Sequence, residues 1–252
     1  MNLTFSINKP LLLVSAIFKK TSGVENLTSL KNRLWEEHKI GYQFLKDPDI
    51  FGIFASRDFI KELTVATTDA EALVENGVTS EEFRAVITET EEYKNWLEKE
   101  WDQNKARIEH ELKGILKIDP PNESFEAVVV HPKIGLGRSL GKNRLAWGHS
   151  EDWPSYSLVY LAHEMLHSVL GSSPLAHAII ELTTDNELRI RLNGSGEYLY
   201  IDEKPIGHDF LLEIEKYLLP SWREFLKSSE NVTEYLKRME KEIPTTLIKK
   251  SR

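Results

Sequence analysis

Residues 161–171 read LAHEMLHSVLG, and the HEMLH segment at their centre decides how the rest of the chain is interpreted. An α-helix advances about 100° per residue, so His167 lies about 40° around the helix from His163, and Glu164 about 100°. Side chains four residues apart are neighbours on a helix, so both imidazole rings can reach one metal ion. Glu164 is displaced enough to act as a base rather than a ligand. The alternative interpretation is an ordinary amphipathic helix with two histidines facing solvent.

The opposite face of this helix is apolar, so the helix is expected to pack against a core and to present its polar side to a site. It is predicted to run from about Ser155 to Leu170 and to break at Gly171. Tyr160 lies on the polar side, with the two histidines. The apolar positions are Leu158, Leu161, Ala162, Met165 and Val169.

The composition is that of an ordinary globular chain with an acidic balance. The 252 residues include 32 basic and 40 acidic side chains, which gives a formal net charge of -8. This balance argues against a nucleic-acid partner, because no basic excess remains to neutralise phosphates. The chain has no cysteine, so disulfides and thiolate metal sites are excluded. Any Zn²⁺ must therefore be held by His, Asp or Glu.

The apolar run Leu11–Phe18 is the one strongly hydrophobic segment near the N-terminus. It is far shorter than the roughly 20 residues that a membrane-spanning helix needs. It is followed by Lys19 and Lys20 rather than by a small-residue cleavage site, so it differs from a signal peptide. We interpret the run as a buried strand, and we expect a cytoplasmic protein without a membrane partner.

The first half of the chain is expected to hold two short strands followed by helices. Proline cannot donate to a central strand ladder, so the strands should be separate. A Ser or Thr with a Glu three residues later is a typical helix start. The expected elements are strands on either side of Lys9-Pro10 within residues 3–18, one or two helices over residues 26–45 with a break near Gly41, and a helix from a capping box at Thr79 and Glu82 to Leu116.

The pattern changes at Asp119-Pro120-Pro121, because two prolines cannot continue a helix. Strands are expected next, and then helices. The expected elements are a strand at 125–132 (FEAVVVHP), a glycine-rich loop at 133–142 (KIGLGRSLGK), a strand at the edge of the sheet at 143–149 (NRLAWGH), a helix opened by Ser173-Pro174 and ended at Asn193-Gly194, a hairpin around Asp202-Glu203, and one or two final helices over residues 209–240 that break at Pro220.

The HExxH pattern on a helix resembles the active-site signature of the zincin metallopeptidases. The resemblance implies that His163 and His167 bind zinc, that Glu164 is the general base, and that a strand before the helix binds the peptide substrate by edge pairing. That strand would be NRLAWGH. HEMLHSVLG also resembles the short motif of the ImmA/IrrE-type regulatory peptidases, but the acidic stretch that follows their motif is not matched convincingly.

The third zinc ligand is sought through the same resemblance. The metzincin extension HExxHxxGxxH is absent, since Leu170 occupies the glycine position, and His177 lies too far along and beyond a helix break. In gluzincins the third ligand is a glutamate on the next helix. An aspartate often follows it four residues later and supports a zinc-bound histidine.

Two glutamates on the helix over residues 174–194 are candidates for this ligand. Glu181 shares an otherwise apolar face with Asp185, and a carboxylate on a buried face needs a partner such as a metal. Glu187 lies about 120° away with Arg191 as an ion-pair partner, although its distance along the chain from His167 is closer to the thermolysin-like spacing. We prefer Glu181. Ordinary surface charge is the alternative for both.

Hydrolysis of a peptide also needs a donor to the oxyanion besides the metal. The candidates after the motif are His208 and the hairpin residues Tyr198 and Tyr200. We choose His208. A capping or packing role is the alternative for each of these residues.

Together these observations predict an α+β, zincin-like fold. It would hold a mixed β-sheet, an active-site helix and largely helical N-terminal and C-terminal parts. Residues 1–118 would form N-terminal strands and a helical subdomain, and residues 119–252 the zincin-like catalytic region, unless the two form one continuous domain. The sequence does not determine the oligomeric state.

The predicted activity is that of a zinc-dependent metallopeptidase of gluzincin type, acting on a peptide or protein substrate. Zn²⁺ is the expected cofactor, with His163, His167 and Glu181 as ligands and with Glu164 and His208 as catalytic residues. Two alternatives stay open. One is a catalytically inactive zincin-like interaction or regulatory module, and the other is a zinc hydrolase of non-peptide amides.

Overall fold

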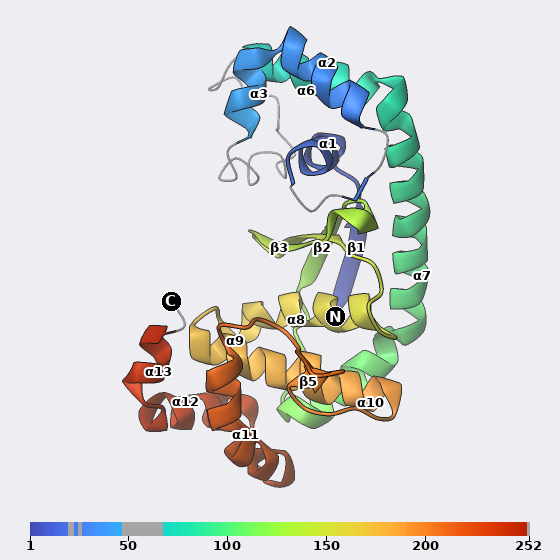
Figure 1. Ribbon diagram of the computed structural model, residues 1–252. Coiled ribbons are helices and arrows are strands. Elements are labelled where there is room, and N and C mark those ends of the chain that lie inside the picture. The colour runs from blue at the N-terminus through green and yellow to red at the C-terminus, as the bar shows by residue number, and fades with distance from the viewer. Residues whose placement is uncertain (20–22, 25–26, 47–67, 251–252) are drawn as a thin grey trace. The chain divides into compact units, whose positions relative to one another are not determined.

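The computed structural model describes residues 1–19, 23–24, 27–46 and 68–250 (Figure 1). It shows a mixed α+β protein, so the predicted fold class is confirmed at this level. The chain forms two compact units that interleave along the sequence. The first, here the C-terminal unit, holds Met1–Asn2, Glu100–Ser124 and Glu151–Arg252, and the second, here the N-terminal unit, holds Leu3–Lys99 and Phe125–Ser150. The predicted division after residue 118 stays a prediction.

The helices and strands follow one another along the chain with the following bounds. From the N-terminus to residue 116 they are β1 (Asn2–Ser6), α1 (Lys9–Phe18), α2 (Thr28–Glu37), α3 (Lys39–Leu45), α6 (Thr68–Thr79) and α7 (Glu81–Leu116). The following strands and short helix are β2 (Ser124–Val129), η2 (Pro132–Ile134), β3 (Leu136–Gly141) and β4 (Arg144–Gly148). The remaining elements are α8 (Tyr156–Leu170), α9 (Pro174–Glu181), the π-helix η3 (Leu182–Leu188), α10 (Arg189–Asn193), β5 (Tyr200–Ile201), β6 (Lys204–Pro205), α11 (Leu212–Lys227), α12 (Val232–Glu242) and α13 (Thr245–Lys250).

The main sheet has the strand order β1-β2-β4-β3. Strand β4 runs parallel to β2, with Ala146 opposite Val128, and antiparallel to β3, with Ala146 opposite Arg138. It therefore has partners on both sides. The expectation that NRLAWGH lies at an edge of the sheet is wrong, and among the described strands β3 is at that edge.

The glycine-rich segment is a strand, not the predicted loop. Strand β3 covers Leu136–Gly141 and turns into β4 through Lys142 and Asn143, whose φ values of 51° and 57° are those of a two-residue hairpin turn. Gly137 pairs with Trp147, and a Cβ at Gly137 would lie 2.9 Å from the indole ring. The glycine is needed there to make room for the tryptophan, so it does not indicate a loop.

The apolar run after Pro10 is a helix, so its interpretation as a strand is wrong. In α1, Pro10 stands in the first turn, where its missing N–H is not needed, and Asn8 accepts a hydrogen bond from the backbone N–H of Leu11 at 2.9 Å. The residues from Leu11 to Ile17 are all buried. A helix buried on every side has no amphipathic pattern, so periodicity could not distinguish it from a strand.

The core of the N-terminal unit forms where α1 meets the neighbouring helices and one face of the sheet. Val128, Val130 and Ala146 contribute to it from the sheet segment. The alternative of two helices before residue 46 is confirmed, but the break lies at His38 and not at Gly41, because α2 ends at Glu37 and α3 starts at Lys39. Gly41 instead lets α3 approach α6. Residue 26, where the helix was expected to begin, lies outside the described residues.

The start of α7 lies one residue later than predicted. Ser80 accepts a hydrogen bond from the N–H of Phe83 at 3.3 Å, so Ser80 takes the capping position. Thr79 is the last residue of α6, and its hydroxyl donates to the carbonyl of Glu75 at 2.8 Å. The helix itself continues to Leu116, as predicted.

In the C-terminal unit, the structure confirms the helix ended by Gly171, the helix opened by Ser173 and Pro174, and the hairpin turn at Asp202 and Glu203. The break expected at Pro220 is wrong. Proline removes one backbone hydrogen bond, and the continuous apolar face of α11, with Leu218 and Trp222 fully buried, offsets this loss. In the part of the chain that the structure describes, no helix has the length and apolarity to cross a membrane.

Candidate metal centre

Helix α8 presents the HEMLH residues towards the polar interior of the C-terminal unit. Its first turn is held by Glu151, whose carboxylate accepts a hydrogen bond from the N–H of Ser157 at 3.0 Å. It ends at Gly171, whose φ of 84° and N–H bond to the carbonyl of His167 stop the helix. The apolar face is buried except at Val169, which is 38% exposed. His163, on the polar face, is also buried, with 2% of its surface exposed.

The next helix faces α8 with side chains spaced four residues apart. Ser173 caps α9 by accepting a hydrogen bond from the N–H of Ala176 at 3.2 Å, and Pro174 follows in the first turn. His177, Glu181 and Asp185 then succeed one another at every fourth position. This spacing places them on one face of the helix, so all three contribute to the same cluster.

The second half of this helical segment, η3, is a π-helix, a rare form that is frequent at functional sites. Thr183 and Thr184 donate their hydroxyl hydrogens to backbone carbonyls four residues back, at 2.7 and 2.8 Å. The Asn186 side chain donates to the carbonyl of Glu181 at 3.0 Å. Side-chain donors thus support the irregular backbone beside the histidines.

His163 is oriented by a buried carboxylate. Its Nδ1 donates to Asp185 Oδ1 at 3.1 Å, and Asp185 has no exposed surface. The other ring nitrogen, Nε2, then faces His177 Nε2 at 3.1 Å. A histidine held through one nitrogen by a carboxylate presents the other in a fixed direction, as metal-bound histidines commonly do.

His167 and His177 complete a set of three imidazoles. The Nδ1 of His167 donates to the carbonyl of Gly171 at 2.9 Å, which leaves Nε2 as its acceptor nitrogen. The rings of His167 and His177 lie 4.7 Å apart between centroids. The ligand atoms of His163, His167 and His177 all lie within 4.8 Å of one another, so they can share a metal ion.

Glu181 belongs to a second set, with His177 and His208, whose ligand atoms also lie within 4.8 Å of one another. Its Oε1 lies 2.5 Å from His208 Nδ1 and 3.6 Å from His177 Nε2, and it accepts the backbone N–H of His208 at 3.0 Å. Its Oε2 is buried and has no hydrogen-bond partner among the described residues. An unpartnered buried carboxylate oxygen is unfavourable unless a cation or a proton satisfies it.

The two candidate glutamates lie in different surroundings. Glu187 is outside the cluster, where it accepts a hydrogen bond from Arg191 Nε at 2.8 Å and another from the hydroxyl of Tyr198. Glu181 is fully buried within the cluster. The structure therefore places Glu181, and not Glu187, in the cluster, where it shares a donor set with His177 and His208.

Glu164 is half-buried beside the imidazoles. Its charge acts on the rings of both motif histidines and favours their protonated forms. Its carboxylate has no hydrogen-bond or ion-pair partner among the described residues.

His208 follows the β5–β6 hairpin and is the one oxyanion candidate that reaches the cluster. Its side chain is 46% exposed, so it is accessible from solvent although Nδ1 contacts Glu181. Tyr198 is bound to Glu187, and Tyr200 belongs to β5. Neither tyrosine is in either of the two donor sets.

The electrostatics of the cluster separate the histidines into different protonation states. Burial and the charges of the other histidines lower the pKa of His177 to about 3. Burial alone would lower the pKa of His163, but the Asp185 carboxylate outweighs it and raises this pKa to about 9 in the metal-free site. Burial raises the pKa of Glu181, and the hydrogen bond to Glu181 raises that of His208.

Sequence reasoning missed two members of this region, the partly buried His177 and the buried Glu215. His177 was excluded because it lies beyond the break at Gly171, yet its spacing of four residues from Glu181 was a signal that both share a face. Glu215, on α11, accepts a hydrogen bond from Asn186 Nδ2 at 3.3 Å. Burial, together with the charges of Glu181 and Asp185, raises its pKa to about 9. No pattern on α11 indicates this residue.

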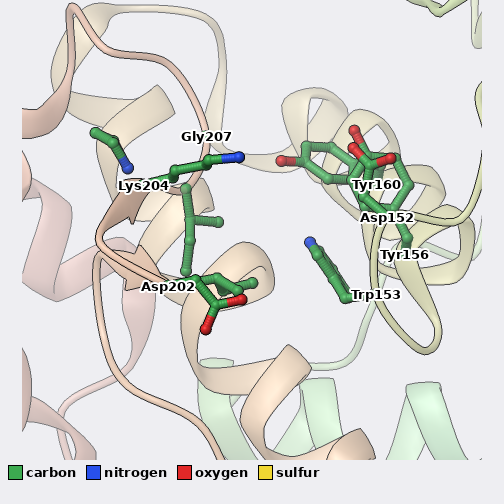
Figure 2. Close-up of a pocket in the computed structure, with 10 residues that line it drawn as sticks. Asp152, Trp153, Tyr156, Tyr160, Asp202, Lys204 and Gly207 are labelled. Atoms are coloured by element: carbon green, nitrogen blue, oxygen red, sulfur yellow. The ribbon is translucent and has the colours of Figure 1, made fainter.

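A pocket of about 550 Å³ borders the cluster (Figure 2). Figure 2 shows Trp153, Tyr156 and Tyr160 on one side and the hairpin residues Lys204 and Gly207 on the other. The ring of Tyr160 lies 5.9 Å from that of His163, and Gly207 directly precedes His208. The other lining residues are Asp152, Ile201, Asp202, Pro205 and Ile206.

The donor set fits a divalent transition metal. Imidazole nitrogens with a carboxylate are the ligands that zinc takes in proteins without thiolates, and one ring is oriented by a buried carboxylate behind it. A cation or a proton would satisfy the unpartnered Oε2 of Glu181. The same residues would fit other transition metals that prefer imidazole.

Comparison with known proteins gives no match to a protein family, to a curated protein or to a solved structure.

Proposed function

We propose that this protein is a zinc-dependent hydrolase, and specifically a metallopeptidase of gluzincin type with a zincin-like fold. The observation that carries the proposal is the arrangement of the HEMLH histidines against one face of the next helix. On that face, Glu181 is buried with an unpartnered oxygen, and Asp185, four residues later, accepts a hydrogen bond from His163 at 3.1 Å. This is the arrangement that the resemblance to gluzincins implies.

The proposed ligands are His163, His167 and Glu181. Three protein ligands and one open position are the requirement of a catalytic zinc site. Zinc, when bound, supplies Lewis-acid activation of water and of the substrate carbonyl. His177 is the competing third ligand, because its Nε2 is 3.1 Å from that of His163. We favour Glu181 because Asp185 stands behind His163 at the expected spacing.

Glu164 is the proposed general base. It takes a proton from the attacking water and later passes it to the leaving amine, which requires a carboxylate that is not already bound to another group. Tyr160 and Gly207 connect the cluster to the pocket, whose volume of about 550 Å³ can hold a substrate side chain. His208 is the proposed oxyanion donor, since Nδ1 faces Glu181 and Nε2 is left for the substrate. A cytoplasmic location is part of this proposal.

Replacement of Glu164 by Gln tests the catalytic role. We expect the variant to keep its metal and its fold and to lose hydrolysis of a mixture of fluorogenic peptides by at least about 100-fold, the usual scale for a general base. Glu187→Gln is the matched control on the same unit and should keep activity. Loss of metal in Glu164→Gln, or unchanged activity, would contradict the assigned role.

A hydrolase of non-peptide amides is a second candidate, favoured by one observation. Strand β4, expected to bind the substrate by edge pairing, is paired on both sides and cannot add a peptide strand. Strand β3 still has an edge among the described strands. Turnover of small acylated amines without turnover of peptides would favour this candidate.

The alternative without turnover is an inactive zincin-like module. It predicts that neither peptides nor amides are hydrolysed and that Glu164→Gln changes no activity. Zinc content alone does not separate it from the enzyme, so the activity of the metal-loaded protein decides between them.

A further inference from the structure

We propose that His177, Glu181 and His208 form a second divalent-cation position next to the one at His163 and His167, so that the cluster is a two-metal centre. The inference rests on the proposed function, because it adds a cation to the same site. The expected ions are Zn²⁺ or another first-row metal that prefers imidazole.

The geometry divides the donors into two overlapping sets. His163, His167 and His177 form one set, and His177, Glu181 and His208 form the other, each within 4.8 Å. The ring centroids of His163 and His208 lie 6.3 Å apart, and that of His177 lies 5.1 Å from His163 and 4.7 Å from His208. The three rings form a triangle, and His177 is the residue that the two donor sets share.

One catalytic ion does not use all of these donors. Zinc takes about four ligands, and a catalytic site leaves one position open, so roughly three protein ligands are needed. Beyond the motif pair, the cluster offers two further imidazoles, His177 and His208, and the carboxylate of Glu181. A second ion accounts for this surplus of donors.

Glu181 is the residue that can join the two positions. Its Oε1 is on the side of His177 and His208, at 3.6 and 2.5 Å from their nitrogens. Its Oε2 has no hydrogen-bond partner, and the residue is completely buried. A carboxylate with two available oxygens can serve two ions, and ions in such centres are about 3.5–4 Å apart.

The chain segment around His208 is built for close approach to this carboxylate. A Cβ at Gly207 would lie 2.3 Å from Glu181 Oε2, so only glycine fits there. Because Gly207 has no Cβ, the backbone N–H of His208 can approach Glu181 and donate to Oε1 at 3.0 Å. In this arrangement His208 binds the second cation, and that cation takes over the oxyanion role otherwise assigned to His208.

Metal stoichiometry tests the second position. The protein is stripped with a chelator, loaded with Zn²⁺ or with Co²⁺ alone, dialysed and measured by elemental analysis. We expect two ions per chain in the parent and one in His208→Ala, and we expect spin coupling between two Co²⁺ ions in the electron paramagnetic resonance spectrum of the parent only. His208 is partly exposed, so the variant should fold, which circular dichroism checks. His110→Ala, an exposed histidine on α7, is the control and should bind as the parent does.

Each other outcome overturns the second position. If the parent binds one ion per chain, and both His163→Ala and His177→Ala lose it, the cluster is a single site with three histidines. The zinc hydrolase proposal would then survive with His177 as third ligand. Equal stoichiometry in the parent and in His208→Ala would leave His208 its role as oxyanion donor. No bound ion in the parent would remove both proposals.

Discussion

Two residues of the cluster, Asp185 and Glu181, carry carboxyl groups in buried positions, where neutral side chains are the usual occupants. Asp185 and Glu181 are fully buried, and each keeps one oxygen without a hydrogen-bond partner among the described residues. Unpaired buried carboxylates are unfavourable unless a cation or a proton compensates them. Glu215 adds a third carboxyl group nearby, and its raised pKa of about 9 means that it is held in the protonated form.

Replacing Glu215 by Gln tests this electrostatic interpretation through pH. A carboxyl group with a pKa of about 9 in the folded state and 4.5 as the ordinary value keeps its proton on folding, so stability falls as pH rises between these values. Below about pH 4 both states are protonated and the group contributes no pH dependence. Glu215→Gln should therefore raise the melting temperature of the chelated protein relative to the parent more at pH 8 than at pH 4.

The control for this measurement is Glu224→Gln, an exposed position on the same helix. It should shift the melting temperature equally at both pH values. The melting temperatures of Glu215→Gln and of the parent are then compared at pH 8 and at pH 4. An equal difference at both pH values would show that Glu215 is ionised in the folded protein.

At the scale of elements, the motif residues could be read from the sequence because helix geometry is regular. His163 and His167 share an arc in α8 as predicted, and Asp185 lies against His163, where the resemblance placed an aspartate. His177 was missed because the turn at Gly171 brings α9 back beside α8. The sequence marks where the turn lies, but it does not give the angle between the two helices. The π-helical turn of η3 was not predictable from spacing either.

Other elements were misread because tertiary packing decided between local alternatives. Helix α1 has no polar side. A buried helix and a buried strand then have the same sequence pattern, a continuous run of apolar residues. Strand β3 contains glycines that serve cross-strand packing against Trp147. Gly207 also makes room for a neighbouring side chain, that of Glu181, and so differs from glycines that only relieve backbone strain.

Replacing Gly207 by Ala tests the link between the hairpin and the metal centre. Gly207 has a φ of 79°, and the new Cβ would lie 2.3 Å from Glu181 Oε2. We expect loss of stability and a zinc affinity at least about 10-fold lower, the scale for disturbed support of a metal ligand. Chelator competition measures the affinity.

Gly194→Ala is a matched control, because Gly194 has a φ of 76° and nothing within 4 Å of a new Cβ. It should lose stability by the backbone strain alone, roughly 1–2 kcal/mol, with unchanged zinc affinity. Equal zinc affinities for the two variants would show that the hairpin does not position Glu181.

For the whole molecule, the two compact units interleave along the sequence. Residues 125–150 cluster with Leu3–Lys99, and α7 contributes residues to both units. Sequence order does not show such interleaving, because it arises from sheet pairing between distant segments such as β1 and β2. The cluster of histidines and carboxylates lies entirely in the C-terminal unit, where α8, α9 and the hairpin follow one another in sequence.

The zinc content of the purified protein tests the central claim most directly. It should be measured after reconstitution for the parent, His163→Ala, Glu181→Ala and Glu187→Ala. We predict that the parent binds zinc, that the His163 and Glu181 variants hold less of it, and that Glu187→Ala equals the parent, since Glu187 is paired with Arg191 away from the cluster. A parent that binds no zinc, or a His163→Ala variant with the zinc content of the parent, would contradict the account.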